Sequence, residues 1–184
     1  MNPTLLIVDI QNDYFAGGKM ELVGMDAACA NTLKLLTIFR ENHYPVIFIQ
    51  HLATKPNATF FIPETTGAEI HHSIKPQNDE TVIIKHYPNS FRETNLHQYL
   101  QEQGLTELII CGAMTHMCID TTTRAATDLG YTCTLIGDAC ATRDLVFDGK
   151  LAPANQVQTA YLAALNGTFA NVVSTGHFVN TILK

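Results

Sequence analysis

The sequence lacks the features that mark proteins of membranes and proteins that bind nucleic acids. None of its apolar runs approaches the roughly 20 residues that a membrane-spanning helix needs. It has no run of basic residues, and 11 Lys and Arg against 17 Asp and Glu give a formal net charge of -6. We therefore expect neither a membrane nor a nucleic acid as partner.

Two other patterns are missing as well. No Gly-x-Gly-x-x-Gly motif follows the first apolar segment, so the sequence gives no support for dinucleotide binding. The five cysteines form no Cys-x-x-Cys pair and are odd in number, which argues against a disulfide framework. No basic region precedes the first short apolar run. We expect a reduced, cytoplasmic protein with one domain over residues 1–184.

What the chain does contain is an alternation of short apolar strands and helical segments. The predicted strands are residues 4–9, 46–50, 81–85, 107–111, 132–136 and 171–174. The predicted helices are residues 26–42, 93–103, 118–129 and 153–165, followed by a short terminal helix at 177–183. Apolar strands separated by helices are typical of a parallel sheet covered on both faces. The pattern predicts a three-layer α/β/α fold with a central, mainly parallel six-stranded sheet.

Three chemically active residues lie where these strands end. Asp9 ends the first apolar strand, Lys85 ends the third, and Cys118 lies between the fourth strand and a predicted helix. The carboxyl ends of parallel strands line the crevice where ligands bind. The sequence therefore predicts that these three side chains converge.

The three residues have complementary chemical roles. A helix N-terminus favours a thiolate, which would make Cys118 a nucleophile at neutral pH. Asp9 would accept the thiol proton and return it to a leaving group, and Lys85 would keep that carboxylate ionised. Alone, each has a structural interpretation: a buried cysteine, a solvated strand-end lysine and an aspartate that caps a turn. Their joint occurrence favours catalysis.

Several spaced motifs resemble the isochorismatase-like family of cysteine hydrolases, which includes nicotinamidases, carbamoyl-amide hydrolases and isochorismatase. The matching segments are residues 6–15, 66–70, 84–85 with 90–91, and 112–118 with Asp120. The resemblance implies an isochorismatase-like, Rossmann-like fold with Asp9, Lys85 and Cys118 as catalytic residues. It also implies a cis peptide between Ala113 and Met114 at an oxyanion pocket, where the backbone N–H groups of Met114 and Cys118 are the expected donors.

The predicted reaction is hydrolysis of a small amide or of a carbamoyl or ureido compound through a thioester on Cys118. It requires neither a metal nor an organic cofactor. Two alternatives stay open: vinyl ether hydrolysis of the isochorismatase type, and a non-catalytic module for thiol sensing or ligand binding. The expected partner is a small-molecule substrate, and the resemblance suggests a homodimer or a larger homo-oligomer.

The long segment 51–79 is a candidate cover for the crevice, because loops of this length are often functional. Its pair Phe60-Phe61 could exclude water from substrate, dock on a neighbouring subunit or pack against the chain's own core. Candidate substrate contacts are Phe15, Phe60, Tyr87 and His116.

The eight histidines raise the question of a metal site. Metal-binding nicotinamidases of the resembled family carry Asp-x-His after the second strand, where this chain has Ile49-Gln50-His51. Metal ligation needs convergent ligands at compatible spacing. We therefore predict no metal and interpret the histidines, apart from His116, as surface residues or as residues with indirect roles.

Overall fold

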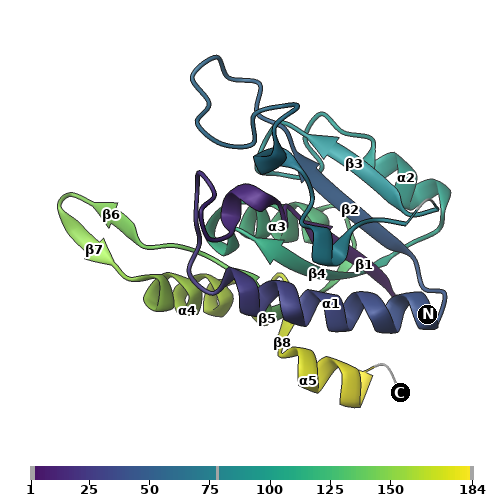
Figure 1. The fold of residues 1–184 in the computed structure, drawn as a ribbon. Coiled ribbons are helices and arrows are strands. Elements are labelled where there is room, and N and C mark those ends of the chain that lie inside the picture. The colour runs from purple at the N-terminus through teal and green to yellow at the C-terminus, as the bar shows by residue number, and fades with distance from the viewer. Residues whose placement is uncertain (1–2, 78, 183–184) are drawn as a thin grey trace.

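The computed structural model describes residues 3–77 and 79–182, and a six-stranded sheet runs through its centre (Figure 1). The strand order is β3-β2-β1-β4-β5-β8, and every neighbouring pair is parallel. The strands are β1 (Thr4–Val8), β2 (Val46–His51), β3 (Thr81–Lys85), β4 (Glu107–Ala113), β5 (Thr132–Ala141) and β8 (Asn171–Val173). The predicted parallel α/β fold is confirmed. The order reverses between β1 and β4, which is where ligands bind in sheets of this kind.

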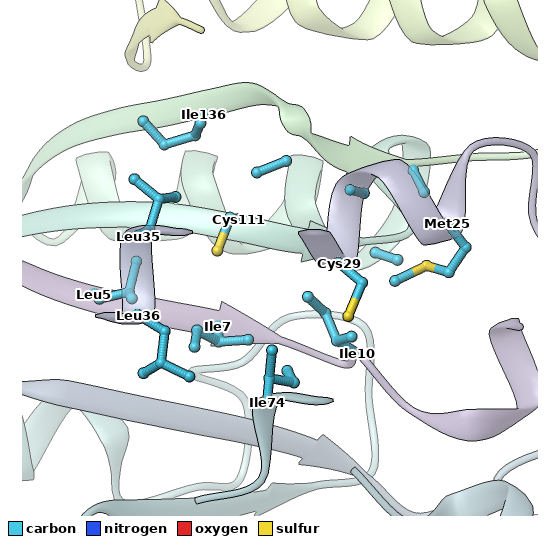
Figure 2. Packing of buried hydrophobic residues seen from close by; sticks show 14 of the residues in the cluster. Leu5, Ile7, Ile10, Met25, Cys29, Leu35, Leu36, Ile74, Cys111 and Ile136 are labelled. Atoms are coloured by element: carbon cyan, nitrogen blue, oxygen red, sulfur yellow. The ribbon is translucent and has the colours of Figure 1, made fainter. Parts of the chain in front are cut away.

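Helices cover both faces of the sheet. The helices are α1 (Met25–Glu41), α2 (Leu96–Glu102), α3 (Asp120–Asp128), α4 (Ala154–Leu165) and α5 (Thr175–His177), which a π-helical turn, η5 (Phe178–Ile182), follows. Successive side chains of β1 point to opposite faces, so Leu5 packs with α1 while Leu6 packs with α2 and α3. Figure 2 shows Leu35 and Leu36 of α1 against the sheet near Cys111. The central strand β1 is apolar and buried on both faces, whereas the edge strand β3 leaves Val82 41% and Ile84 46% exposed.

Three of the differences from the predicted element boundaries have a cause that the structure shows. Strand β5 continues to Ala141, because a register shift between Ile110 and Gly112 lets the ends of β4 and β5 pair again. Helix α2 begins at Leu96, after a left-handed residue, Glu93, whose φ is 55°. Cys118 lies in a π-helical turn, η4 (Thr115–Ile119), that precedes α3.

A hairpin between β5 and α4 is absent from the sequence prediction. Strands β6 (Leu145–Phe147) and β7 (Lys150–Ala152) are antiparallel and joined by Asp148 and Gly149, both at positive φ. A two-residue connection of this kind is the preferred turn for a hairpin. The hairpin projects away from the sheet (Figure 1), and Phe147 is 87% exposed.

The segment between β2 and β3 is held against the body of the protein. It contains the short 3-10 turns η2 (Thr66–Ala68) and η3 (His72–Ile74). The Asp13 carboxylate accepts a hydrogen bond from the Phe61 amide at 2.6 Å. Phe61 is fully buried, with its ring centroid 4.6 Å from that of Tyr14. Of the three possibilities for Phe60-Phe61, packing against the chain's own core is the one that Phe61 adopts.

Two of the predicted segments contain a residue that the structure does not describe. These residues are Asn78 in the long loop and Leu183 in the terminal helix. Among the helices of residues 3–77 and 79–182, none combines the length and apolar character needed to cross a membrane.

Candidate active site

The three residues predicted to converge do so at the carboxyl edge of the sheet. Asp9 directly follows β1, Lys85 is the last residue of β3, and Cys118 lies in the turn η4 after β4. The Lys85 Nζ is 2.7 Å from Asp9 Oδ2, and both side chains are fully buried. Cys118 is 4% exposed. The site is therefore a water-poor ion pair beside a thiol.

The geometry around Asp9 places its carboxylate against the sulfur. An oxygen of Asp9, a ring nitrogen of His51 and the Cys118 Sγ all lie within 4.8 Å of one another. Asp9 has a positive φ of 51°, which is uncommon for a residue other than glycine. Its amide donates to the Ile49 carbonyl at 3.0 Å, and its own carbonyl accepts from the Gln11 amide. The strained turn thus fixes the side chain over the end of β1.

Lys85 is held by several acceptors. Its ammonium donates to the carbonyls of Tyr87 at 3.2 Å and Pro88 at 3.1 Å, and it lies 3.4 Å from His51 Nδ1. Burial by itself lowers the pKa of Lys85, but the charges and hydrogen bonds of Asp9 and Cys118 offset this, and the pKa is raised overall. The amine therefore stays protonated and compensates the charge of the carboxylate.

The state of Cys118 differs from the expectation based on a helix end. Burial, together with the Asp9 carboxylate, raises the pKa of Cys118 to about 12, and the opposing effect of Lys85 is smaller. The effect of the helix dipole falls off within the first turn, and Cys118 is the fourth residue of η4. The resting group is a thiol, so a base must remove its proton during the reaction.

The backbone before Cys118 is shaped by an unusual turn. The peptide bond between Ala113 and Met114 is cis. The Met114 carbonyl accepts hydrogen bonds from the amides of Met117 at 3.0 Å and Ile119 at 3.2 Å. Gly112 has a φ of 126°, and a Cβ there would overlap the Val8 carbonyl. Met114 and Cys118, whose amides are the predicted oxyanion donors, are the N-cap and the fourth residue of η4.

A cavity of about 360 Å³ lies beside His51, and Asp9, Lys85 and Cys118 are not among the residues that line it. It shares three residues with the surroundings of the Lys85 ammonium: His51, Tyr87 and Pro88. Phe60 and Phe61 are apolar residues of the cavity wall. Two of the four predicted substrate contacts, Phe60 and Tyr87, thus line the cavity.

The other two predicted contacts have partners within the protein. Phe15 is 8% exposed and stacks on His71, with ring centroids 3.9 Å apart. His116 is buried, and its Nδ1 is 2.6 Å from Thr142 Oγ1. Neither residue lines the cavity. A role in contacting substrate inside this cavity is therefore not supported for either residue.

Three residues that were not predicted as site residues support the geometry: Gln11, Asp13 and His51. The Gln11 side chain accepts from the His51 amide at 2.8 Å and donates to the His51 carbonyl at 2.9 Å. The Asp13 carboxylate holds Phe61 in place. The signal available for His51 was its position at the end of β2, opposite Lys85.

Asp9, His51 and Cys118 also form a donor set of the type that binds zinc, with one oxygen, one nitrogen and one sulfur. The same carboxylate, however, is 2.7 Å from the Lys85 ammonium. A divalent cation at this position would be repelled by that fixed positive charge, and the pair would have to separate. The arrangement therefore fits an organic ligand better than a metal ion.

Comparison with known proteins agrees with the architecture. The model of the isochorismatase domain matches residues 3–176. The isochorismatase family protein YddQ of Bacillus subtilis (strain 168), whose function is uncharacterized, is 49% identical over 179 residues, which cover 97% of this chain and 99% of YddQ. The crystal structure of an isochorismatase from Pseudomonas putida KT2440 has a TM-score of 0.90 and 40% identity, covering 95% of this chain and 89% of that chain.

A relative with a named activity is the streptothricin hydrolase of Streptomyces noursei. It is 34% identical over 142 residues, which are 77% of this chain and 50% of that protein. Sheet topology and comparisons together define a hydrolase of the parallel α/β type. The chain belongs to the isochorismatase family.

Proposed function

We propose that this protein hydrolyses a small amide, or a carbamoyl or ureido compound, through a thioester on Cys118. The observation that carries the proposal is the buried Lys85–Asp9 pair, with 2.7 Å between Nζ and Oδ2, next to the Cys118 thiol. If the ion pair served only the stability of the fold, a thiol and a nearby cavity would not be required. The similarity to a streptothricin hydrolase supports hydrolytic chemistry of this kind.

The first step transfers the proton of the Cys118 thiol to the Asp9 carboxylate. The thiol is neutral at rest because its pKa is raised to about 12. Asp9 is the base within reach, and its Oδ1 has no hydrogen-bond partner among the described residues. Lys85 remains charged and stabilises the thiolate that forms, so the net charge of the three groups is unchanged.

The thiolate then adds to the carbonyl carbon, and the electron pair of the C=O bond moves to the oxygen. The backbone N–H groups of Met114 and Cys118 are the proposed donors to this oxyanion. Preorganised donors of this type contribute about 3 kcal/mol each to the transition state. The C–N bond then breaks, and the proton held by Asp9 goes to the leaving nitrogen, which departs as an amine or as ammonia.

Water completes the cycle. Asp9, again a carboxylate, takes a proton from a water molecule that attacks the thioester carbonyl. The carbon–sulfur bond breaks, and the proton returns to the sulfur. The product is a carboxylic or carbamic acid, and the Cys118 thiol is regenerated. The proposed steps use neither a metal nor an organic cofactor.

The proposal is tested by ammonia release from a panel of small primary amides, carbamoyl compounds and ureido acids. We expect turnover by the wild type and a loss of at least about 10⁴-fold in the Cys118→Ala variant, because the nucleophile is absent. The matched control is Cys140→Ala, a second buried cysteine, which pairs with Gly112 across β4 and β5. Equal turnover by wild type and Cys118→Ala would contradict the assignment.

Two other outcomes define the alternatives. Cleavage of a vinyl ether by both wild type and Cys118→Ala, with the amides untouched, would establish the isochorismatase type of reaction instead. Saturable binding of small molecules with no turnover of either class would establish the ligand-binding or thiol-sensing module.

A further inference from the structure

His51 connects the proposed catalytic residues with the neighbouring cavity. It is the last residue of β2 and pairs in register with Lys85 of β3. One of its ring nitrogens is within 4.8 Å of both an Asp9 oxygen and the Cys118 Sγ. The ring also forms part of the cavity wall. Its side chain is therefore in contact with the site on one side and the cavity on the other.

The backbone of His51 is fixed from both directions. Gln11 accepts a hydrogen bond from its amide at 2.8 Å and donates one to its carbonyl at 2.9 Å. The Phe61 ring packs beside the imidazole, with the centroids 5.7 Å apart. A ligand entering the cavity would therefore meet an imidazole of defined position.

The neighbours of His51 also determine which of its nitrogens carries hydrogen. Lys85 Nζ is an ammonium, which can only donate, and it lies 3.4 Å from His51 Nδ1. Nδ1 is therefore the acceptor, and the proton resides on Nε2. Burial lowers the pKa of His51 to about 4, so the ring is neutral at pH 7 and keeps this tautomer. The ring presents one N–H donor that Lys85 does not use.

The cavity itself is mainly apolar. Its walls include Phe60, Phe61, Ala53, Ala58 and Pro88. Its volume of about 360 Å³ is at the lower end of the range for small-molecule pockets. Thr54, Lys55, Asn57, Thr59 and His86 also line it, but His51 is the lining residue with a ring nitrogen within 4.8 Å of an Asp9 oxygen and the Cys118 sulfur. Next to the thiol, the pocket therefore selects a compact, mostly hydrocarbon group with an acceptor for the His51 donor.

We propose that this cavity binds the group attached to the scissile carbonyl, and that His51 Nε2–H donates a hydrogen bond to an oxygen of that group. The inference rests on the proposed function and names its substrate class: compact, mainly apolar amides with an ether, hydroxyl or carbonyl oxygen near the scissile carbon. The oxygen must be near that carbon because the imidazole lies so close to the Cys118 sulfur. His51 is thus a specificity-determining residue rather than a proton carrier.

The test compares two ligands of nearly equal size and shape, tetrahydrofuran-2-carboxamide and cyclopentanecarboxamide, which differ by one ring oxygen. Their dissociation constants are measured by calorimetry on the Cys118→Ala variant, which cannot form a thioester. We expect about fivefold to tenfold tighter binding of the oxygen-bearing ligand, the value of one hydrogen bond. Because only binding is measured, the result is independent of whether the amide hydrolysis proposal holds.

Substitutions then assign the preference to a residue. His51→Phe in the same background should bring the ratio of the two dissociation constants to about one, and His51→Asn, which retains an N–H donor, should restore part of it. The control is His86→Phe, because His86 lines the same cavity but has its Nδ1 2.7 Å from the Leu52 carbonyl. It should keep the preference. An equal ratio in Cys118→Ala and in Cys118→Ala with His51→Phe would overturn the inference, as would loss of the preference in the His86→Phe variant alone.

Discussion

At the scale of single residues, the candidate site is organised by one buried pair of opposite charges. Lys85 and Asp9 are fully buried and 2.7 Å apart, and the neighbouring Cys118 stays a neutral thiol. Together the three groups carry no net charge at rest. Transfer of the thiol proton to Asp9 keeps the total unchanged, so the chemical step does not require a new net charge in a water-poor environment.

The first prediction concerns Lys85→Met. Removing the ammonium leaves the Asp9 carboxylate buried and unpaired, which costs about 3 to 5 kcal/mol of folding stability. We also expect a loss of activity of at least about 100-fold, because no positive charge stabilises the thiolate that forms beside Asp9. Denaturant unfolding at pH 7 measures the first effect, and ammonia release measures the second.

A double variant, Asp9→Asn with Lys85→Met, separates the two effects. It contains no unpaired charge, so part of the lost stability should return. Activity should remain absent because the base is missing. A double variant as active as wild type would show that the pair serves folding alone.

The second prediction uses the pH dependence of folding. The pKa of His51 is lowered from 6.5 to about 4 by burial, so between these values the unfolded chain binds more protons than the folded one. The contribution of His51 to the free energy of unfolding is therefore complete above pH 6.5 and decreases as the pH falls toward 4. We expect His51→Phe to lose less stability than wild type between pH 7 and 4.5 in denaturant titrations. An equal loss would contradict the assignment of a neutral, buried imidazole.

Much of the site could be predicted from single residues, because parallel strands bring their carboxyl ends together. This rule placed Asp9, Lys85 and the segment of Cys118 correctly at one edge of the sheet. It missed His51 because the predicted strand ended one residue early, at Gln50. The protonation state of Cys118 could not be predicted, since burial is a property of the folded chain.

At the scale of elements, the cover over the cavity depends on a few hydrogen bonds from the turn after β1. Asp13 Oδ2 accepts from the Phe61 amide at 2.6 Å, and Oδ1 accepts from the Lys19 amide at 3.2 Å. Gly67 packs directly on this carboxylate, where a Cβ would overlap it. Asp13 is thus one of the buried points that hold the loop, and Gln11, whose Nε2 donates to the Ala68 carbonyl at 2.7 Å, is another.

The third prediction follows from the hydrogen bond between Asp13 and the Phe61 amide. Asp13→Ala leaves the Phe61 amide buried without an acceptor, which costs about 1 to 3 kcal/mol. We expect a higher KM and faster amide hydrogen exchange in residues 58–68. The matched control is Asn12→Ala, which removes an exposed side-chain hydrogen bond to the Thr66 carbonyl in the same loop. It should change stability by less than about 1 kcal/mol. Similar effects from both variants would contradict the account.

The hairpin β6–β7 shows where element prediction failed although a signal was present. Asp148-Gly149 lies between two short apolar segments and is among the strongest sequence indications of a hairpin. The end of β5 had no comparable signal, because its extension depends on a register shift against β4. Pairing between distant strands is set by the whole sheet and cannot be inferred from either segment alone.

At the scale of the whole molecule, the apolar surface that stands out is this same hairpin. Val146 is 68% exposed, Phe147 87% and Leu151 59%. Two-stranded hairpins are marginally stable in water by themselves, and exposed apolar side chains gathered on one projection mark an interaction site. Phe61, one of the two residues considered as a surface for a neighbouring subunit, is fully buried within its own chain.

The fourth prediction is that the chain forms a homodimer or a larger homo-oligomer in which the hairpin contacts a second copy. Phe147→Ser should shift the molar mass measured by light scattering toward that of the monomer. Leu129→Ser is the control, because Leu129 is a 44% exposed apolar residue at the C-terminal end of α3. A monomeric wild type, or an unchanged mass for Phe147→Ser, would contradict this arrangement.

The most direct test of the central claim is intact-mass spectrometry during turnover of an amide substrate, followed by peptide mapping. The account predicts that wild type carries a transient mass increase equal to the acyl group, that the increase maps to Cys118, and that hydroxylamine removes it. Cys118→Ala should show neither the adduct nor turnover. Sustained turnover of the amide without any adduct on Cys118, or an adduct on another cysteine, would contradict the thioester mechanism.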